Sequence, residues 1–265
     1  MTHAEVGEPL IVFRHVRKAF GQKVVYADLS LDVRRGEIVT VMGPSGVGKS
    51  VMLKMLIGLI SVDSGEIVFD GDDVGKMNER QAVDVRRRIA YLFQGAALFD
   101  SFSVGENVAY GLREQFWNTM SGEEIDARVA QSLELVGLPG IQDMRPADLS
   151  GGMKKRVGLA RTLALHPEVI LYDEPTTGLD PINTGRINNL ILTIRKQLGL
   201  TSIVVTHDMG TAFAVSDRMV VLNHGRVQLM GTPHEMRHTS DPFVRQFIEG
   251  RAPEAEDVHT LLATS

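Results

Sequence analysis

Residues 43–50 read Gly-Pro-Ser-Gly-Val-Gly-Lys-Ser, and this stretch decides the fold. It matches the pattern G-x-x-x-x-G-K-[S/T] at every fixed position. An apolar run over 37–42 precedes it, and a helix is predicted from about residue 49 to 59. The glycines let the backbone curl so that its N–H groups point at phosphate oxygens. A glycine-rich turn without a ligand is the weaker interpretation, because pattern and context are both complete.

The loop therefore predicts an ATP site made of Gly43, Pro44, Ser45, Gly46, Val47, Gly48, Lys49 and Ser50. Lys49 is expected to reach the β- and γ-phosphates, and the Ser50 hydroxyl to bind Mg²⁺. The N-terminus of the following helix adds partial positive charge. The loop alone does not say what the ATP is used for.

A second apolar run, Val169–Tyr172, ends in the adjacent carboxylates Asp173 and Glu174. Asp173 is the candidate partner of Mg²⁺, through water. Glu174 is the candidate general base that orients the attacking water. Taken alone, the pair favours a solvated strand end. The phosphate-binding loop upstream reverses that preference.

His207 follows the apolar run Ser202–Thr206 and lies 33 positions after Glu174. That distance is one strand–helix–strand step, which predicts that both residues lie at the same edge of a sheet. A histidine there can contact the γ-phosphate and hold Glu174 and the water in line.

The bulk composition restricts the class of protein. The 265 residues are 43% hydrophobic, enough for a sizeable core, and include no cysteine, which excludes disulfides and thiolate metal sites. The net charge of −5 argues against nucleic acid as a main partner. The N-terminal ten residues do not resemble a secretory signal. The apolar stretch over 51–62 contains Lys54 and is shorter than the roughly 20 residues of a membrane span.

The order of apolar runs predicts an α/β fold. Strands are predicted over 10–16, 27–33, 37–42, 66–69, 89–93, 169–172, 202–206 and 219–222, with a helical stripe over 187–198. Alternation of strands and helices indicates a parallel sheet covered on both faces. Residues from about 95 to 165 look mostly helical, with Ile125, Val129, Leu133 and Val136 on one face. We predict one domain over 10–248 with a helical insert, followed by a polar tail over 249–265.

Residues 149–153, Leu-Ser-Gly-Gly-Met, resemble the signature sequence of ABC ATPases, LSGGQ. The resemblance extends over residues 10–240. It makes Phe20 the aromatic that stacks on adenine, Gln94 the Q-loop glutamine with a role in catalysis and Mg²⁺ binding, and 178–180 the D-loop. It implies a P-loop parallel-sheet core with an N-terminal antiparallel β subdomain and an inserted helical subdomain.

The same resemblance implies a homodimer. In the family, the signature binds the γ-phosphate of ATP held by the other subunit, so Leu149, Ser150, Gly151, Gly152 and Asp180 would contact the partner's ATP. Two glycines and a serine at a helix N-terminus are suited to an anion. Met153 replaces the usual glutamine and cannot donate its hydrogen bonds, but Ser150 and Gly152 remain, so we expect activity to be kept.

Three further segments resemble the ATPase subunits of Mla-type (MCE-associated, Mkl or Ttg2) phospholipid transporters: residues 93–108, the signature with its basic neighbours, and residues 241–250. This resemblance implies an MlaE-like permease, an MlaD-like MCE protein and an MlaB-like STAS protein as partners. It also implies a location on the cytoplasmic face of the bacterial inner membrane, peripheral through the permease. The C-terminal segment with Phe243, Val244 and Phe247 could reach the neighbouring ATPase or pack on its own domain.

Two other features have a functional and a structural interpretation. Ala96, Ala97, Leu98 and Phe99 could line a groove for a permease helix or pack inside the insert. The basic runs over 86–88 and 154–156 could attract lipid headgroups or nucleic acid, but we interpret them as solvated helix faces.

Two alternative functions remain open at this point. The first is the ATPase of a small-solute ABC importer, which uses the same motor with another permease. The second is a non-transport ABC ATPase, for example in iron–sulfur assembly. The sequence shows one motor domain and no sustained heptads, unlike translation or repair members of the family.

Overall fold

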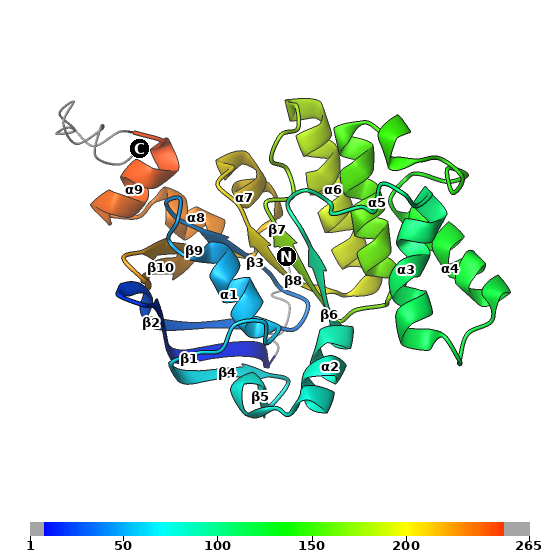
Figure 1. Ribbon diagram of the computed structural model, residues 1–265. Coiled ribbons are helices and arrows are strands. Elements are labelled where there is room, and N and C mark those ends of the chain that lie inside the picture. The colour runs from blue at the N-terminus through cyan, green and yellow to red at the C-terminus, as the bar shows by residue number, and fades with distance from the viewer. Residues whose placement is uncertain (1–7, 252–265) are drawn as a thin grey trace.

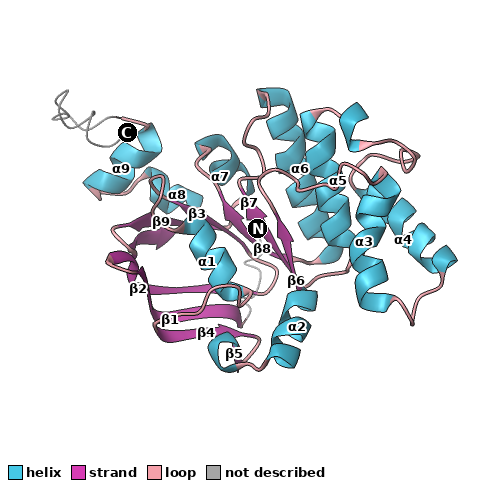
Figure 2. Cartoon of the chain, viewed as in Figure 1, coloured by secondary structure: helices cyan, strands magenta, loops and turns pink. Residues whose placement is uncertain are grey.

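The structure is a computed structural model that describes residues 8–251. One curled sheet holds strands β1 (Pro9–Phe20), β2 (Lys23–Arg34), β3 (Ile38–Met42), β4 (Ser64–Phe69), β5 (Asp72–Asp73), β6 (Ile89–Leu92), β7 (Val169–Asp173), β8 (Thr201–Val205), β9 (Arg218–Asn223) and β10 (Arg226–Gly231). The spatial order is β5-β4-β1-β2-β10-β9-β3-β8-β7-β6 (Figures 1 and 2).

The helices lie on both sides of this sheet and in a separate group. They are α1 (Lys49–Leu56), α2 (Glu79–Arg88), α3 (Val104–Phe116), α4 (Gly122–Leu135), α5 (Gly151–Ala164), α6 (Pro181–Leu198), α7 (Met209–Val215), α8 (Pro233–Arg237) and α9 (Pro242–Glu249). Two short 3₁₀ turns, Val74–Lys76 and Pro146–Asp148, connect other elements. In Figure 1, α3, α4 and α5 stand beside the edge of the sheet that β6 forms.

The sheet has a parallel half and an antiparallel half. Strands β6, β7, β8, β3 and β9 run parallel to one another. Strand β1 pairs antiparallel with both β2 and β4. Strand β10 connects the halves, because it runs antiparallel to β9 and parallel to β2. The predicted parallel core, antiparallel β region and α/β class are confirmed.

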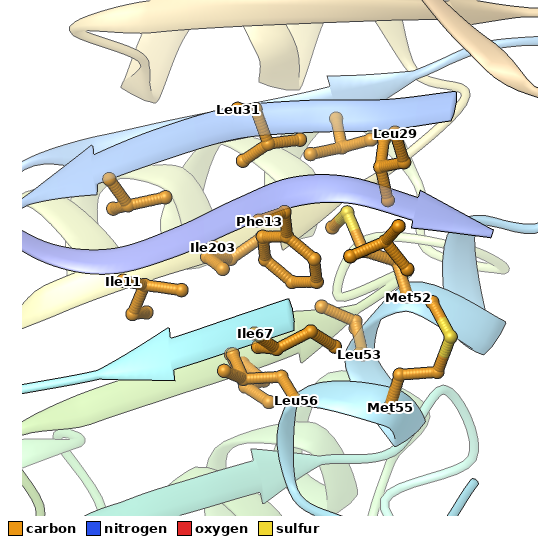
Figure 3. Packing of buried hydrophobic residues seen from close by; sticks show 14 of the residues in the cluster. Ile11, Phe13, Leu29, Leu31, Met52, Leu53, Met55, Leu56, Ile67 and Ile203 are labelled. Carbon is orange, nitrogen blue, oxygen red and sulfur yellow. The ribbon is translucent and has the colours of Figure 1, made fainter. Parts of the chain in front are cut away.

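Burial explains the two halves. Every residue of β3 and β8 is buried, as expected for central parallel strands that helices cover on both faces. The antiparallel strands instead alternate between buried and exposed residues, with α1 on their inner face. Figure 3 shows this packing: Met52, Leu53 and Leu56 of α1 lie against Phe13 of β1 and Ile67 of β4. Packing of an apolar helix face therefore places α1, and the loop before it, over the sheet.

The helical region has a core of its own. Ile125, Val129 and Leu133 are buried on one face of α4, as predicted, and Val136 is buried just after its end. Helices α3 and α4 each begin with a serine whose side chain accepts a hydrogen bond from a glutamate N–H three residues later. These caps define where the two helices begin.

Several boundaries differ from the predictions. The helix after the glycine loop ends at Leu56 rather than Leu59, because Gly58 takes a left-handed conformation with φ of 69°. Strand β10 was not predicted. Leu198 of the α6 stripe is exposed rather than buried.

The basic runs are not simply solvated helix faces, so that interpretation was wrong for three residues. Arg88 donates two hydrogen bonds, 2.6 and 2.9 Å long, to the Glu168 carboxylate and a third to Asp70. Arg156 donates to the backbone carbonyls of residues 136 and 137. Lys155 is buried. Side chains within one short basic run can therefore differ in burial and in hydrogen-bond partners.

The C-terminal helix α9 packs on its own domain. Val244 is fully buried in a cluster with Met42, Met219 and Met236, and Phe243 and Phe247 lie partly buried against the same cluster. Of the predicted tail, residues 252–265 fall outside the described part of the chain.

Candidate active site

A cleft of about 450 Å³ lies at the carboxyl ends of the parallel strands. It brings together residues from four distant segments: Ser45, Gly46, Gly48, Lys49, Ser50 and Val51 of the loop and α1, then Gln94, Asp173 and Glu174, then Val205 and His207. The end of parallel strands is where α/β folds bind ligands. Nine of these eleven residues, all except Val51 and Val205, were predicted as site residues from the sequence.

The glycines of the loop are required by geometry. A Cβ atom on Gly43 would lie 2.6 Å from the Leu222 carbonyl oxygen, and one on Gly48 would lie 2.5 Å from a Val25 methyl group. Gly48 also has a φ of 109°, which favours glycine. The buried Tyr26 hydroxyl donates a 2.8 Å hydrogen bond to the Gly48 carbonyl. The loop is therefore held close to both halves of the sheet.

Lys49 is folded back on this loop. Its Nζ donates hydrogen bonds to the carbonyl oxygens of Gly43, at 2.8 Å, and Pro44, at 3.2 Å. Burial lowers the pKa of Lys49, and the carboxylates of Glu174 and Asp173 partly oppose that shift. The ammonium group is thus positioned at the cleft and held by weak neutral partners that a phosphate could replace.

Two side chains form hydrogen bonds to the Asp173 carboxylate. Ser50 Oγ donates to Asp173 Oδ1 at 3.0 Å, and Tyr91 Oη donates to Asp173 Oδ2 at 2.7 Å. Burial raises the pKa of Tyr91, with a further contribution from this hydrogen bond. A hydroxyl and a carboxylate in contact, with the Gln94 amide lining the same cleft, are the hard oxygen donors that Mg²⁺ prefers. The residues present therefore fit Mg²⁺.

Tyr91 was not predicted as a site residue. It lies in the predicted strand 89–93, but its contact to Asp173 arises because β6 and β7 are parallel neighbours, with Tyr91 in register with Leu171. No motif in the sequence encodes that pairing of strands.

Glu174 and His207 form a contact at the mouth of the cleft. The Glu174 Oε2 atom lies 2.9 Å from His207 Nδ1, and it also accepts a 3.2 Å hydrogen bond from the Thr177 hydroxyl. Glu174 has a φ of 52°, which is unusual for a residue other than glycine. Its side chain is mostly buried, whereas that of His207 is mostly exposed. A carboxylate oriented in this way can accept a proton from a water molecule at a bound phosphate.

A second cleft adjoins the first along the loop. Ser45 and Gly46 line both, and Lys23, Val24, Val25, Asn223 and His224 line only the second. Phe20, the predicted adenine-stacking residue, is half exposed at the end of β1, one turn before these residues of β2. Lys18 Nζ lies 5.1 Å from the centre of its ring. Phe20 therefore lies near the second cleft but is not among the residues that line it.

The signature residues lie elsewhere. Ser150 caps α5 by accepting a hydrogen bond from the Met153 N–H, and Asp180 caps α6 by accepting from Ile182 and Asn183. A Cβ on Gly152 would lie 3.3 Å from the Asn183 side chain, so the two helix N-termini are adjacent. Neither Asp180 nor any residue of 149–152 lines the cleft that contains Lys49. The glycine loop and the signature residues therefore lie at separate places in one chain.

Comparison with known proteins identifies this combination. The family model for the ABC transporter matches residues 26–177. The chain belongs to the ABC transporter family.

Two curated relatives of this ABC chain share most of its length. The intermembrane phospholipid transport system ATP-binding protein MlaF of Haemophilus influenzae is 38% identical and covers 93% of both chains. The probable ribonucleotide transport ATP-binding protein mkl of Mycobacterium leprae is 42% identical over 91% of this chain and 69% of its own.

A solved ABC structure supports the fold and the reaction. The dimeric post-hydrolysis state of the ATP-binding cassette MJ0796 bound to ADP and Pi has a TM-score of 0.76 at 31% identity, and the match covers 84% of this chain and 98% of that one. The chain is the ATP-binding and ATP-hydrolysing subunit of an ABC transporter. Across residues 8–251, no helix is both long enough and apolar enough to span a bilayer.

An apolar groove of about 500 Å³ lies next to the ATP cleft. Residues from α2, β6, α3 and α5 and the segment after Gln94 line it, among them Tyr91, Phe93, Ala97, Phe99 and Tyr110. The rings of Phe99 and Tyr110 are 4.8 Å apart. Of the four residues predicted to line such a groove, Ala97 and Phe99 do so. Ala96 is instead buried against Gly158, and Leu98 packs on the core of the helical region.

Proposed function

We propose that this ABC chain forms a homodimer that binds two ATP molecules with Mg²⁺ and drives phospholipid transport through a membrane permease. The main support for the dimer is that Ser150 and Asp180 lie apart from Lys49 within one chain. A second chain is therefore needed to bring the two groups to the same nucleotide. A helix N-terminus with free N–H groups favours an anion, and the partner's γ-phosphate would supply one. The solved relative named above is also a dimer.

In the proposed reaction, the loop N–H groups and Lys49 hold the β- and γ-phosphates. Ser50 and Gln94 would hold Mg²⁺ directly and Asp173 through water, and the ion would neutralise charge that develops on the phosphates. Glu174 accepts the proton of the attacking water, and His207 keeps the carboxylate and the γ-phosphate aligned. Tyr91 keeps the Asp173 carboxylate from rotating.

The transport function rests on the relatives and on the groove. MlaF is named for phospholipid transport, and it matches this chain over nearly its whole length. The groove beside Gln94 has the aromatic and apolar lining that suits a short helix of a permease. We propose that this permease is MlaE-like, that MlaD-like and MlaB-like proteins complete the assembly, and that the permease holds the chain at the cytoplasmic face of the inner membrane.

The dimer is tested with Glu174→Gln, which keeps the shape of the side chain but removes the base. We expect turnover to vanish while ATP binding is kept and the closed dimer accumulates, as measured by light scattering with and without ATP. A monomer in saturating ATP, or a crystal in which one protomer encloses the nucleotide unaided, would contradict the proposal.

The transport proposal is tested by purifying the assembly from detergent-solubilised membranes and identifying its members by mass spectrometry. An MCE protein with the permease supports phospholipid transport. A permease without an MCE partner supports a small-solute importer, and no membrane protein at all supports a non-transport ATPase. Phe99→Asp should release the chain from the permease, because a carboxylate is costly to bury in an apolar groove. Val83→Asp, an exposed residue of α2 that does not line the groove, is the control.

A further inference from the structure

Lys155 is a buried lysine to which the proposed reaction assigns no role. It lies on the second turn of α5 with 9% of its surface exposed. Its Nζ donates a 3.1 Å hydrogen bond to the backbone carbonyl oxygen of Glu174. Lysine is rarely buried unless its ammonium group has a partner. Among residues 8–251, Lys155 forms no ion pair with a carboxylate, so this carbonyl is its partner.

The bond holds a residue whose backbone is strained. Glu174 takes a left-handed conformation, with φ of 52°, which is unfavourable for a residue with a Cβ. Its N–H donates to the Val205 carbonyl at 2.8 Å, and its carbonyl accepts from Lys155 and, at 3.4 Å, from the Thr177 N–H. Lys155 therefore supplies the shorter of the two bonds that orient this carbonyl. The orientation of the peptide in turn sets the direction of the Glu174 side chain.

The signature lies at the N-terminus of α5, about one turn before Lys155. Lys155 is five residues after the cap Ser150, or about 7.5 Å along the helix axis. Gly152 packs against Asn183 near the N-terminus of α6, and Met153 and Leu179 belong to the same apolar cluster. A shift of α5 is therefore transmitted as a rigid body from Ser150 to the Lys155 side chain.

The positive charge of Lys155 strengthens its hydrogen bond to the Glu174 carbonyl oxygen. Burial lowers its pKa, and the nearby Glu174 carboxylate partly opposes the shift. A charged donor makes a stronger hydrogen bond to a carbonyl than a neutral donor does. The contact therefore joins the signature helix to the residue that we assign as the base.

We propose that Lys155 is a positioning residue that couples the placement of α5 to Glu174 in the same protomer. The inference rests on the proposed two-ATP dimer. There, the N-terminus of α5 contacts the ATP bound by the partner, whereas Glu174 acts on the ATP bound by its own protomer. Occupation of one site thereby orients the base of the other, and hydrolysis becomes cooperative in ATP.

The test measures ATP hydrolysis by the full-length chain against ATP concentration. In Lys155→Met, which keeps the length but removes the donor, we expect kcat to fall about ten-fold or more. The KM for ATP should stay within about three-fold and the Hill coefficient should approach 1. Lys155→Arg keeps a charged donor and should restore most of kcat and of the cooperativity. Lys196→Met, an exposed lysine of α6, is the matched control and should behave as wild type.

The outcomes separate the two proposals. An unchanged kcat in soluble Lys155→Met, a failure of Lys155→Arg to recover activity, or a wild-type Hill coefficient of 1 would overturn the coupling. Wild-type hydrolysis by a monomer would instead overturn the proposed dimer. If Lys155→Met does not fold, Lys155→Gln replaces it, because the neutral amide is shorter and should show the same loss; wild-type kcat in that variant would also overturn the coupling.

Discussion

The Tyr91 hydroxyl donates a 2.7 Å hydrogen bond to Asp173 Oδ2, while Ser50 occupies the other oxygen of the same carboxylate at 3.0 Å. The Tyr91 ring also lines the apolar groove beside the cleft. The Tyr91 side chain thus binds the proposed Mg²⁺ ligand through its hydroxyl, and its ring forms part of the groove proposed to bind the permease. This position makes Tyr91 the most informative residue that no motif indicated.

Tyr91→Phe removes the hydroxyl and keeps the ring. We expect kcat for ATP hydrolysis to fall about three- to ten-fold, because the carboxylate loses one of its two restraints. The Mg²⁺ concentration that gives half-maximal activity should rise. Titration of both quantities checks the prediction, with Tyr110→Phe as control, since Tyr110 lines the groove and is not among the residues of the cleft. Wild-type Mg²⁺ dependence would remove Tyr91 from this role.

Lys49→Ala tests the phosphate cradle. The Lys49 ammonium lies at the cleft, held by two loop carbonyls. We expect its loss to weaken ATP binding about 10- to 100-fold, because a charge-assisted contact to the phosphates disappears. Calorimetric titration with ATP measures this directly. Unchanged ATP affinity would contradict the assignment of the loop.

His207→Ala tests the alignment of the base. Because His207 Nδ1 contacts Glu174 Oε2, the variant should lower kcat about 100-fold while ATP affinity stays within a few-fold. Single-turnover hydrolysis and binding titrations separate the two effects. Equal loss of binding and turnover would indicate that His207 holds the nucleotide rather than the base. His224→Ala, on the wall of the second cleft, tests whether any histidine near the loop has the same effect.

Arg88→Ala tests the ion cluster that joins the two halves of the sheet. Arg88 bonds Glu168, just before β7, and Asp70, just after β4. The groups are partly exposed, so we expect a loss of about 1–2 kcal/mol in the free energy of unfolding at pH 7. Arg87→Ala, which removes only a surface pair with Asp84, should cost less than about 0.5 kcal/mol.

The contribution of Arg88 should depend on pH. Its hydrogen bonds hold the pKa values of Asp70 and Glu168 below their usual range. A carboxylate whose pKa is depressed in the folded state stabilises the fold above its unfolded pKa of about 4. That stabilisation is lost as the pH falls through the folded pKa. The difference between wild type and Arg88→Ala in urea denaturation should therefore be constant from pH 7 to 5 and shrink below about pH 4.

The sequence alone predicted those motifs whose functional residues are close to one another along the chain. The loop over 43–50, the carboxylate pair Asp173–Glu174 and the cap Ser150 each act through residues within one turn of each other. Their backbone requirements, such as the left-handed glycine at 48, are local and appear directly in the residue types. The same holds for the face of α4 formed by Ile125, Val129 and Leu133.

Tertiary structure decided every contact that depends on which strands and helices become neighbours. Tyr91 meets Asp173 because β6 pairs with β7, and Lys155 meets Glu174 because α5 packs where β7 ends. The basic runs also required the tertiary structure. Arg88 bonds to Glu168, 80 positions away, and Lys155 bonds to the Glu174 carbonyl, 19 positions away. Residue type and spacing determined that this chain binds and hydrolyses ATP. Long-range packing, which no local pattern encodes, decided which side chains hold the catalytic groups in place.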